Sequence, residues 1–368
     1  MQKVQTSVTG PATLDSVAAR AGVSRQTVSN VLRHPGRVAA PTRDRVMSAI
    51  RDTGYRPSLP ARQLATRRAN AIAVRAERQQ DGISGLVLDA FYHGLAEAGQ
   101  DNGLRVLLYA QPDDDVAELA VIEELLHTGA ADAVVLTATS TGDARPMSLD
   151  DAGLTFCAFG RPWGHEDDPH DWVDVDGAAG TSLAVRHLLD SGHRRIAYLG
   201  WPDDGSAPST GTDRRQGWLD ELDRAGIGER LEARALNDSE AAEAAALALL
   251  RTDWAPDAFV CASDTLALGA HRAVMTVAHD GATPVAVVGF DATPVAAALG
   301  LASVAQPIDQ VAHQCIDLLL GRFVEPDRPA RGLLLPPTLR LPGQSPGQRS
   351  VNATASDTTT ATTSRSAP

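Results

Sequence analysis

The 368-residue sequence predicts an α/β fold in which a small helical domain precedes a larger domain of two lobes, each built on a parallel sheet. Three observations lead to this prediction. Residues 13–56 show only the helical spacing of apolar residues, whereas from residue 71 onward short apolar runs alternate with helical patterns. The two parts also differ in charge. The composition, with 43% hydrophobic and 4% aromatic residues, suits a folded globular protein.

The N-terminal part is basic although the whole chain is acidic. Residues 1–69 contain Lys3 and eleven arginines against three aspartates, which gives them a net charge of +9. Because the whole chain has a net charge of −13, the remaining residues carry −22. A cationic head on an acidic body favours a polyanion as the partner of the head alone. The alternative is an arginine-rich surface that is merely solvated.

Residues 13–56 are expected to form three short helices. Thr13 is suited to cap the first helix, over residues 14–21, and Gly22 can adopt the positive φ of a tight turn. Ser24 is suited to cap the second helix, over residues 25–32. The third helix is expected over residues 42–53, with a proline before it and a glycine after it.

The second of these helices has a polar outer face with hardly an acidic residue near it. Its apolar positions Val28, Val31 and Leu32 are expected to point into the core. Two helices joined by a short turn that contains glycine form a helix-turn-helix, whose second helix fits the major groove of DNA. Arginine can donate two hydrogen bonds to guanine, and glutamine or asparagine can pair with adenine. We therefore predict DNA contacts from Ser24, Arg25, Gln26, Thr27, Ser29 and Asn30. A small helical bundle without DNA function shares this apolar spacing and stays open as an alternative.

Two series of strands and helices follow. Strands of the first series are expected at 71–74, 104–110, 131–137 and 154–159, with helices near 86–100 and 116–128. Strands of the second series are expected at 195–200, 257–262, 283–290 and 301–306, flanked by helices near 177–190, 211–226, 239–251, 264–279 and 308–321. Two such series predict two lobes with a cleft between them, which is the usual place for a small ligand.

Several classes of protein and site are not indicated. The cysteines Cys157, Cys261 and Cys315 are widely spaced and predict neither a disulfide framework nor a zinc site. The N-terminus lacks the apolar run of a secretory signal, and the apolar stretch at 281–290 is too short to cross a bilayer, so we expect a cytoplasmic protein without membrane contact. Phosphate-binding loops and nucleophile elbows are absent from the sequence, and the acidic loop at 165–171 lacks metal-ligand spacing. We predict no catalytic residue, no cofactor and no metal.

The chain resembles the lactose-repressor (LacI) family of bacterial transcription regulators from about Thr13 to Leu341. The most specific part of the resemblance is TLDSVAARAGVSRQTVSNVL, followed by VAAPTRDRVMSAI and TGYRPSLPARQLATRRAN. In that family the first stretch is the helix-turn-helix, and the segment ARQLA is a hinge helix that folds when two subunits sit on an operator. The resemblance implies that Arg25, Gln26 and Asn30 contact bases.

The resemblance also implies that Leu64, in the hinge, is pushed into the minor groove. An apolar wedge between base steps costs a few kcal/mol of unstacking, which contacts to the bent DNA can offset. The arginines around it, Arg62, Arg67 and Arg68, supply attraction to phosphates. The alternative is that Leu64 only packs within a linker helix.

The resemblance completes the domain organisation. We expect a disordered N-terminus at 1–12, a helix-turn-helix domain at 13–57, a hinge helix and linker at 58–70, a two-lobed effector-binding and dimerisation domain at 71–341, and a disordered tail at 342–368. The tail is rich in Ser, Thr, Gly and Pro and cannot bury a core. The two-lobed domain looks like the family's periplasmic-binding-protein-type domain.

Residues of this domain are carried over as effector contacts by the same resemblance. The pattern R-x-x-G-W places Arg214 and Trp218 at the family's ligand-contacting arginine, and strand ends place the polar residues Ser263, Asp264, Asp291 and Gln306 beside it. Carboxylates and amides at strand ends in a cleft suit hydroxyl-rich ligands such as sugars. As an alternative, Asp264 and Asp291 could cap the helices that follow them.

One departure from the family affects the predicted effector. The family often has an Asp-Arg pair after the fourth strand, but Gly160 and Arg161 stand here, so one hydroxyl-binding carboxylate is missing. Arg161 is kept as a predicted effector contact.

The sequence thus predicts a homodimeric transcriptional regulator, a repressor, that binds a pseudo-palindromic operator and responds to a small effector, a sugar or a related metabolite. One alternative is a cytoplasmic solute-binding sensor without DNA function. Another is a sugar-processing enzyme on a similar α/β fold.

Overall fold

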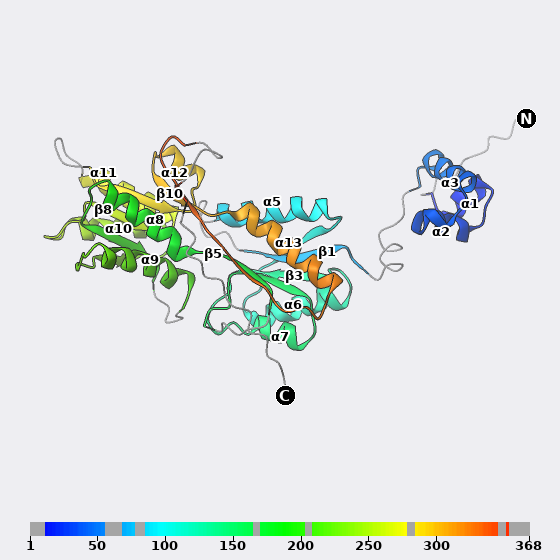
Figure 1. Cartoon of the computed structure of the whole chain (residues 1–368), viewed down its shortest axis with the longest axis horizontal. Coiled ribbons are helices and arrows are strands. Elements are labelled where there is room, and N and C mark those ends of the chain that lie inside the picture. The colour runs from blue at the N-terminus through cyan, green and yellow to red at the C-terminus, as the bar shows by residue number, and fades with distance from the viewer. Residues whose placement is uncertain are drawn as a thin grey trace, which may run out of the picture. The chain divides into compact units, whose positions relative to one another are not determined.

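The computed structural model describes residues 12–55, 68–77, 85–164, 170–202, 208–277, 284–344 and 351–352 (Figure 1). The chain divides into two compact units, Met1–Ala69 and Asn70–Pro368. The predicted N-terminal segment 1–12 and the predicted hinge at 58–70 lie almost wholly outside the described residues.

The first unit consists of three α-helices and a short 3-10 helix. These are α1 (Leu14–Ala21), α2 (Arg25–Arg33), η1 (Pro35–Arg37) and α3 (Ala40–Thr53). The predicted caps are present: the Thr13 side chain accepts a hydrogen bond from Ser16 N, and the Ser24 side chain accepts one from Thr27 N. Gly22 ends α1 with a φ of 64°, the left-handed conformation that favours glycine.

Apolar side chains from all three helices close the core of this unit. Val17 of α1, Val28 and Val31 of α2, and Val46 of α3 are buried together. The prediction that Leu32 points inward is wrong, because Leu32 is 37% exposed. The core of so small a bundle is already filled by the valines on one side of α2, so Leu32 remains at its edge.

The first lobe of the second unit is a six-stranded parallel sheet with helices on both faces. The strand order is β11-β5-β4-β3-β1-β2. Helices α5 and α13 pack together over one face, and α6 and α7 cover the other (Figure 1). The elements are β1 (Ala71–Ala76), α5 (Gly85–Asp101), β2 (Arg105–Ala110), α6 (Asp115–His127), β3 (Ala133–Leu136), α7 (Arg145–Asp151), β4 (Phe156–Phe159), β5 (Trp172–Val175), α13 (Ile308–Val324) and β11 (Gly332–Leu335).

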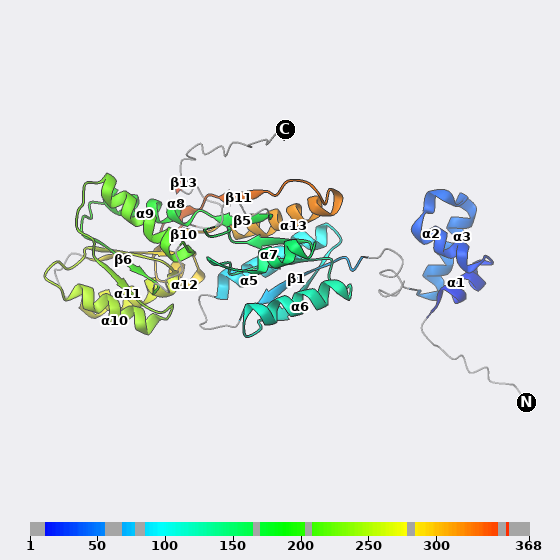
Figure 2. The same cartoon turned by 90° about the horizontal axis from the view of Figure 1, so that it is seen from below.

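The second lobe is a seven-stranded sheet in the order β13-β12-β10-β9-β8-β6-β7, parallel except for the β10–β12 and β12–β13 pairs. Helices α8 and α9 lie on one side and α10 and α11 on the other (Figure 2). The elements are α8 (Gly177–Asp190), β6 (Ile196–Gly200), α9 (Thr210–Arg224), β7 (Glu232–Arg234), α10 (Ser239–Leu250), β8 (Ala258–Cys261), α11 (Asp264–Val277), β9 (Ala286–Phe290), α12 (Pro294–Ala298), β10 (Ala302–Ala305), β12 (Thr338–Arg340) and β13 (Val351–Asn352).

The chain passes between the lobes three times, from β5 to α8, from β10 to α13, and from β11 to β12. The first two passages bring residues 174–177 and 305–308 to the boundary between the lobes. Residues from both sheets are thereby presented at this boundary, where the cavity described below lies.

All eight predicted strands and all predicted helices of the second unit are present, with shifted ends. The sequence missed short elements, namely β5, β7, β11, β12, α7 and α12. It also missed β13: within the predicted unstructured tail, Val351–Asn352 pair with β12. Among the described residues, no helix combines the length and the apolar character needed to span a membrane.

Candidate functional site

The polar face of α2 is open to solvent in the first unit. Ser24, Arg25 and Gln26 are exposed, whereas Thr27, Ser29 and Asn30 are half-buried. Gln26 Nε2 donates a hydrogen bond to Asn30 Oδ1 over 3.1 Å, one helical turn away. The guanidinium of Arg25 lies 3.8 Å from the Asp15 carboxylate, and both side chains are about two-thirds exposed. Such an exposed pair holds the arginine only weakly, so it can exchange this carboxylate for a base edge.

The residues predicted to bind DNA through the hinge are described only in part. Arg62, Leu64 and Arg67 lie outside the described residues. Arg68 is described and exposed.

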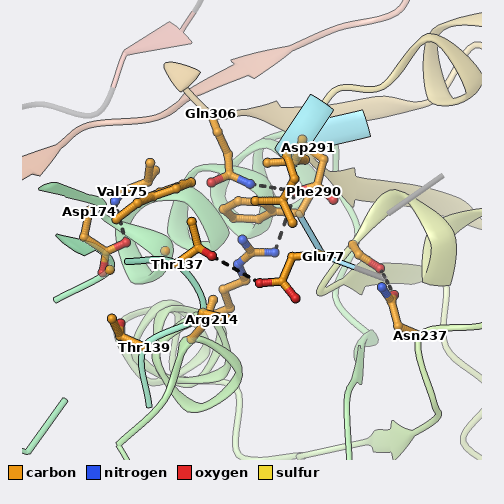
Figure 3. A pocket seen from close by; sticks show the side chains of 18 of the residues that line it. Glu77, Thr137, Thr139, Asp174, Val175, Arg214, Asn237, Phe290, Asp291 and Gln306 are labelled. Carbon is orange, nitrogen blue, oxygen red and sulfur yellow. Dashed lines mark hydrogen bonds and ion pairs between the residues drawn. The ribbon is translucent and has the colours of Figure 1, made fainter. Parts of the chain in front are cut away.

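A cavity of 560 Å³ lies between the two lobes of the second unit (Figure 3). Residues after β1, β3 and β4 of the first lobe line it, and so do residues at the ends of β6, β8 and β9 and at the start of α9 in the second lobe. Four of the predicted effector contacts line this cavity, namely Arg214, Ser263, Asp291 and Gln306. The carboxyl ends of parallel strands are the expected location for such a site.

The first of these four residues, Arg214, has its guanidinium held in place by its neighbours. Its guanidinium carbon lies 3.6 Å from the centroid of the Phe290 ring and 5.2 Å from that of Trp201. Arg214 Nη1 donates to the carbonyl oxygen of Ala262 over 2.5 Å and lies 3.9 Å from Asp291 Oδ1. Two aromatic rings and a carbonyl therefore fix the guanidinium, while the side chain remains part of the cavity lining.

Asp291 directly follows β9 and has an unusual backbone. Its φ is 117°, a region that non-glycine residues rarely adopt, and Gln306 Nε2 donates to its Oδ1 over 2.8 Å (Figure 3). Burial raises the pKa of Asp291 to about 7, and the nearby Arg214 opposes this shift. The carboxyl group can therefore change its protonation state near neutral pH.

Ser263 accepts a hydrogen bond from the helix that follows it and also lines the cavity. Its Oγ donates to Asn237 Oδ1 over 2.7 Å and accepts from Leu266 N over 3.2 Å, in the first turn of α11. Asn237 also lines the cavity, so this pair presents one amide and one hydroxyl from the second lobe.

Two predicted effector contacts lie inside the second lobe instead. Trp218 is fully buried, stacks on Tyr198 with ring centroids 5.5 Å apart, and donates from Nε1 to Ile196 O. Asp264 accepts from Thr293 N and from Ser303 Oγ, both over 2.6 Å. Neither residue lines the cavity. Trp218 is a core residue, and Asp264 holds the loop between β9 and α12.

Arg161 is placed beside the cavity and does not line it. Its Nε donates to Asp174 Oδ2 over 2.7 Å, and its Nη2 lies 3.4 Å from Asp213 Oδ2. Both carboxylates do line the cavity. The cavity lining therefore contains two carboxylates next to Arg161, although the family's carboxylate is missing at Gly160. Gly160 itself has a φ of 127°, and a Cβ there would collide with Thr139.

The sequence did not single out several residues that line the cavity. From the first lobe come Glu77, Tyr92, Thr137, Thr139, Phe159, Trp163 and Asp174, and from the second lobe come Trp201, Asp213, Asn237 and Phe290. Asp213 is the direct neighbour of Arg214, and Asp174 follows the alternating pattern of β5, so these two carried a weak local signal. The others are ordinary strand-end or loop residues, except Tyr92, which lies in α5.

Glu77 is held by a network of charged side chains buried within the first lobe. Arg75 donates to Glu77 Oε1 and to Glu118 Oε2, and Arg145 donates to the same Glu118 oxygen over 2.7 Å. Arg145 Nη2 also donates to the carbonyl oxygens of Thr137 and Ala138. This network fixes the carboxyl end of β3, where Thr137 donates to Glu77 (Figure 3).

The cavity is more acidic than basic. The lining carboxylates Glu77, Asp89, Asp174, Asp213 and Asp291 are faced by the cation of Arg214, with Arg75 and Arg161 behind the lining. Its aromatic side chains offer apolar faces. Within the described ranges, no group of three or more His, Cys, Asp or Glu side chains is arranged to hold a metal ion.

Two family models match the chain. Residues 13–58 match bacterial regulatory proteins of the lacI family, and residues 185–345 match the periplasmic binding protein-like domain. The HTH-type transcriptional regulator CelR of Thermobifida fusca is 34% identical over 331 residues, which are 86% of this chain and 94% of that protein.

Solved structures agree with these matches. A LacI-family regulatory protein from Chloroflexus aggregans is 31% identical, with a TM-score of 0.67, over 75% of this chain and 99% of that one. The transcriptional regulator CelR in complex with cellobiose is 29% identical, with a TM-score of 0.64, over 90% of this chain and 98% of that one. The relatives are regulators and not enzymes, and the chain itself belongs to the LacI family of transcriptional regulators.

Proposed function

We propose that this regulator is a repressor that binds a pseudo-palindromic operator as a homodimer and responds to an uncharged sugar in the cavity between its lobes. The observation that carries the sugar assignment is the lining of that cavity, where carboxylates and amides alternate with aromatic rings. We assign residues 13–57 to DNA binding, 58–70 to the hinge and 71–341 to the effector and the dimer.

The operator contacts are proposed from the face of α2. Arg25, Gln26 and Asn30 are the proposed base-reading residues, and the neighbouring Ser24, Thr27 and Ser29 are proposed to contact phosphates. The hydrogen bond from Gln26 Nε2 to Asn30 leaves Gln26 Oε1 and one N–H free, which is the pair of groups that adenine requires. Arg62, Arg67 and Arg68 add phosphate attraction, and Leu64 is the wedge of the hinge. One helix-turn-helix reads one half-site, so a twofold operator requires two chains.

The effector contacts are proposed from the polar groups of the cavity. Arg214, Ser263, Asp291 and Gln306 contact the sugar directly from the second lobe. Sugar hydroxyl groups both donate and accept, so they can satisfy carboxylates, amides and a guanidinium at once. The aromatic faces suit the apolar faces of sugar rings. A phosphorylated sugar would bring its anion close to several carboxylates, and we expect it to be rejected.

The control of DNA binding is proposed to be a linkage between the two ligands. A sugar that binds one arrangement of the lobes better than another shifts the dimer toward it, and the operator affinity changes by the same coupling free energy. The coupling in such systems is typically about 1–3 kcal/mol, which changes operator affinity roughly 5- to 150-fold.

Footprinting of DNA upstream of the protein's own gene, with and without sugars, tests this function. The panel includes cellobiose, which occupies the related CelR structure, and glucose 6-phosphate as an anionic comparison. We expect a protected, twofold-symmetric segment whose protection is changed by an uncharged sugar and left unchanged by the phosphate ester. Protection that no uncharged sugar alters, or that only the phosphate ester alters, would reject the sugar assignment.

A further inference from the structure

Arg161 connects the two lobes at the edge of the cavity. It follows β4 in the first lobe, and Asp213 lies in the first turn of α9 in the second lobe. Arg161 Nη2 lies 3.4 Å from Asp213 Oδ2 and also donates to the carbonyl oxygen of Val175 over 3.2 Å. Val175 ends β5, just before the chain passes into the second lobe. One guanidinium thus contacts the first lobe, the passage between the lobes and the second lobe.

The same side chain organises three residues of the cavity lining. Asp174 accepts from Arg161 Nε over 2.7 Å, and Asp213 accepts from its Nη2. The guanidinium carbon lies 4.6 Å from the centroid of the Trp163 ring, which is almost fully buried. A ligand in the cavity can touch both carboxylates and the tryptophan, but Arg161 itself lies behind them.

Charge repulsion makes this arrangement depend on the arginine. Asp174, Asp176 and Asp213 are close enough for their charges to interact, and Asp176 also caps α8. Burial raises the pKa of Asp213, the Arg161 charge lowers it, and Asp176 and Asp174 raise it further. Ala178 N, in the first turn of α8, donates to Asp213 over 3.1 Å. Without the arginine, three carboxylates would face each other across the boundary between the lobes.

We propose that Arg161 is a positioning residue that ties the lobes together and brings Asp174 and Asp213, one from each lobe, within reach of a single effector. The sequence suggested a direct effector contact at this position. The geometry gives it an indirect role instead. When Arg161 joins the lobes, it also places Asp174 and Asp213 together in the effector site. The effector part of this inference rests on the proposed function, whereas the tie between the lobes does not.

The test measures the distance between the lobes in the full chain without any sugar. Exposed Glu123 on α6 and Ala244 on α10 are changed to cysteine and spin-labelled, which is selective because Cys157, Cys261 and Cys315 are buried. Doubly labelled protein is diluted with unlabelled protein, so that pulsed electron resonance reports distances within one chain. The variants are Arg161→Met, Arg161→Lys and Asp213→Asn. Arg186→Met is the matched control, because Arg186 lies on α8 and pairs with Glu221 away from the cavity.

We expect longer and broader distances for Arg161→Met and Asp213→Asn, a partial return for Arg161→Lys, and the wild-type distribution for Arg186→Met. If Arg161→Met does not fold, as judged by circular dichroism, Asp213→Asn and Arg161→Lys carry the comparison. Distributions for Asp213→Asn and Arg161→Met that match the wild type would overturn the proposal. Equal shifts for Arg161→Met and Arg186→Met would do so as well.

The pH dependence of the interlobe distance is a second test, because a purely structural role of Arg161 would not depend on the charge of Asp213. Because burial raises the pKa of Asp213, its carboxylate takes up a proton as the pH is lowered from neutral into the acid range, and its ion pair with Arg161 is then lost. The wild-type distance should lengthen over this range, and the Asp213→Asn distance should not change. An equal response in both proteins would contradict the tie.

A cellobiose titration tests the role of Arg161 in effector binding. The signal is the tryptophan fluorescence of the protein, and the Trp163→Phe variant shows how much of the change comes from Trp163. We expect about tenfold weaker binding by Arg161→Met, because Asp174 and Asp213 are then no longer held within reach of the same ligand. Unchanged affinity would reject the positioning role toward the effector. If the wild-type protein binds no sugar but its interlobe distances change as described, the proposed function is wrong, and the role of Arg161 in joining the lobes is still supported.

Discussion

The guanidinium carbon of Arg214 lies over the Phe290 ring, 3.6 Å from its centroid, and Nη1 of the same group lies 3.9 Å from Asp291 Oδ1. A carbonyl oxygen, that of Ala262, accepts a hydrogen bond from the same group. The arginine is therefore held in place before any ligand arrives. A fixed donor loses little conformational entropy on binding, which favours effector affinity.

Replacing Arg214 should weaken effector binding without weakening operator binding in the absence of effector. For Arg214→Met we expect a loss of about 1.5–3 kcal/mol, roughly ten- to hundredfold, because a charge-assisted hydrogen bond is removed. Isothermal titration with the sugar identified by footprinting measures the effect. Arg215→Met is the control, since Arg215 is the next residue of α9 but pairs with Glu232. Equal losses in the two variants would contradict a specific role for Arg214.

Trp218 should matter for stability and not for effector contact. In Trp218→Phe the Nε1 hydrogen bond to Ile196 O is lost and the core is left underfilled, so we expect a loss of about 1–3 kcal/mol in the free energy of unfolding. Urea denaturation measures this loss. Effector affinity of the folded variant should stay within about twofold of the wild type. A large loss of affinity with unchanged stability would restore Trp218 as an effector contact.

Asp291 should make the stability of the protein depend on pH. Since burial raises its pKa to about 7, the folded protein keeps a proton between about pH 4 and pH 7 that the unfolded chain has lost. Unfolding then releases a proton, so this residue lowers stability as the pH rises, by at most about 1.4 kcal/mol per pH unit. The stability of Asp291→Asn relative to the wild type should therefore increase with pH across this range. Urea denaturation at several pH values checks the sign, and a decrease would contradict it.

Arg25 and Arg68 should affect DNA binding in different ways. Arg25→Ala should relax the preference for one base pair of the operator by about 1–3 kcal/mol, because Arg25 is proposed to read a base edge. Arg68→Ala should weaken operator and random DNA alike and reduce the salt dependence by about one phosphate contact. Gel shifts on the operator, on single-site variants and on random DNA, at several salt concentrations, separate the two effects. Equal losses on operator and random DNA for Arg25→Ala would contradict its assignment.

Apart from the edge strand β2, the strands that the sequence predicted are central strands that are largely buried. β3 (Ala133–Leu136) and β8 (Ala258–Cys261) are continuous apolar runs, as expected for central parallel strands. β5 carries Asp174 between buried valines, and β7 is the polar segment Glu232–Arg234 at a sheet edge. Their sequences resemble loops, and only pairing with a neighbouring strand makes them regular.

Residues of the candidate site could be predicted from the sequence where a polar residue directly follows an expected strand. Asp291 and Gln306 follow β9 and β10, and the structure brings them together in one hydrogen bond. Glu77 also follows a strand directly, but the strand was expected to end at residue 74, whereas β1 runs to Ala76, so Glu77 was missed; Trp163 lies in the loop after β4 and gave no such signal. The R-x-x-G-W pattern misplaced Trp218, since the residue four positions after Arg214 turns toward the sheet and not toward the cavity.

Binding of the full-length protein to a twofold-symmetric operator is the most direct test of the central claim. A duplex with both half-sites, a duplex with one half-site and a random duplex are compared by gel shift at moderate ionic strength. The account predicts that two chains bind the symmetric duplex at least about a thousandfold more tightly than random DNA, and that the half-site duplex binds much more weakly. Equal affinity for all three duplexes would contradict the account.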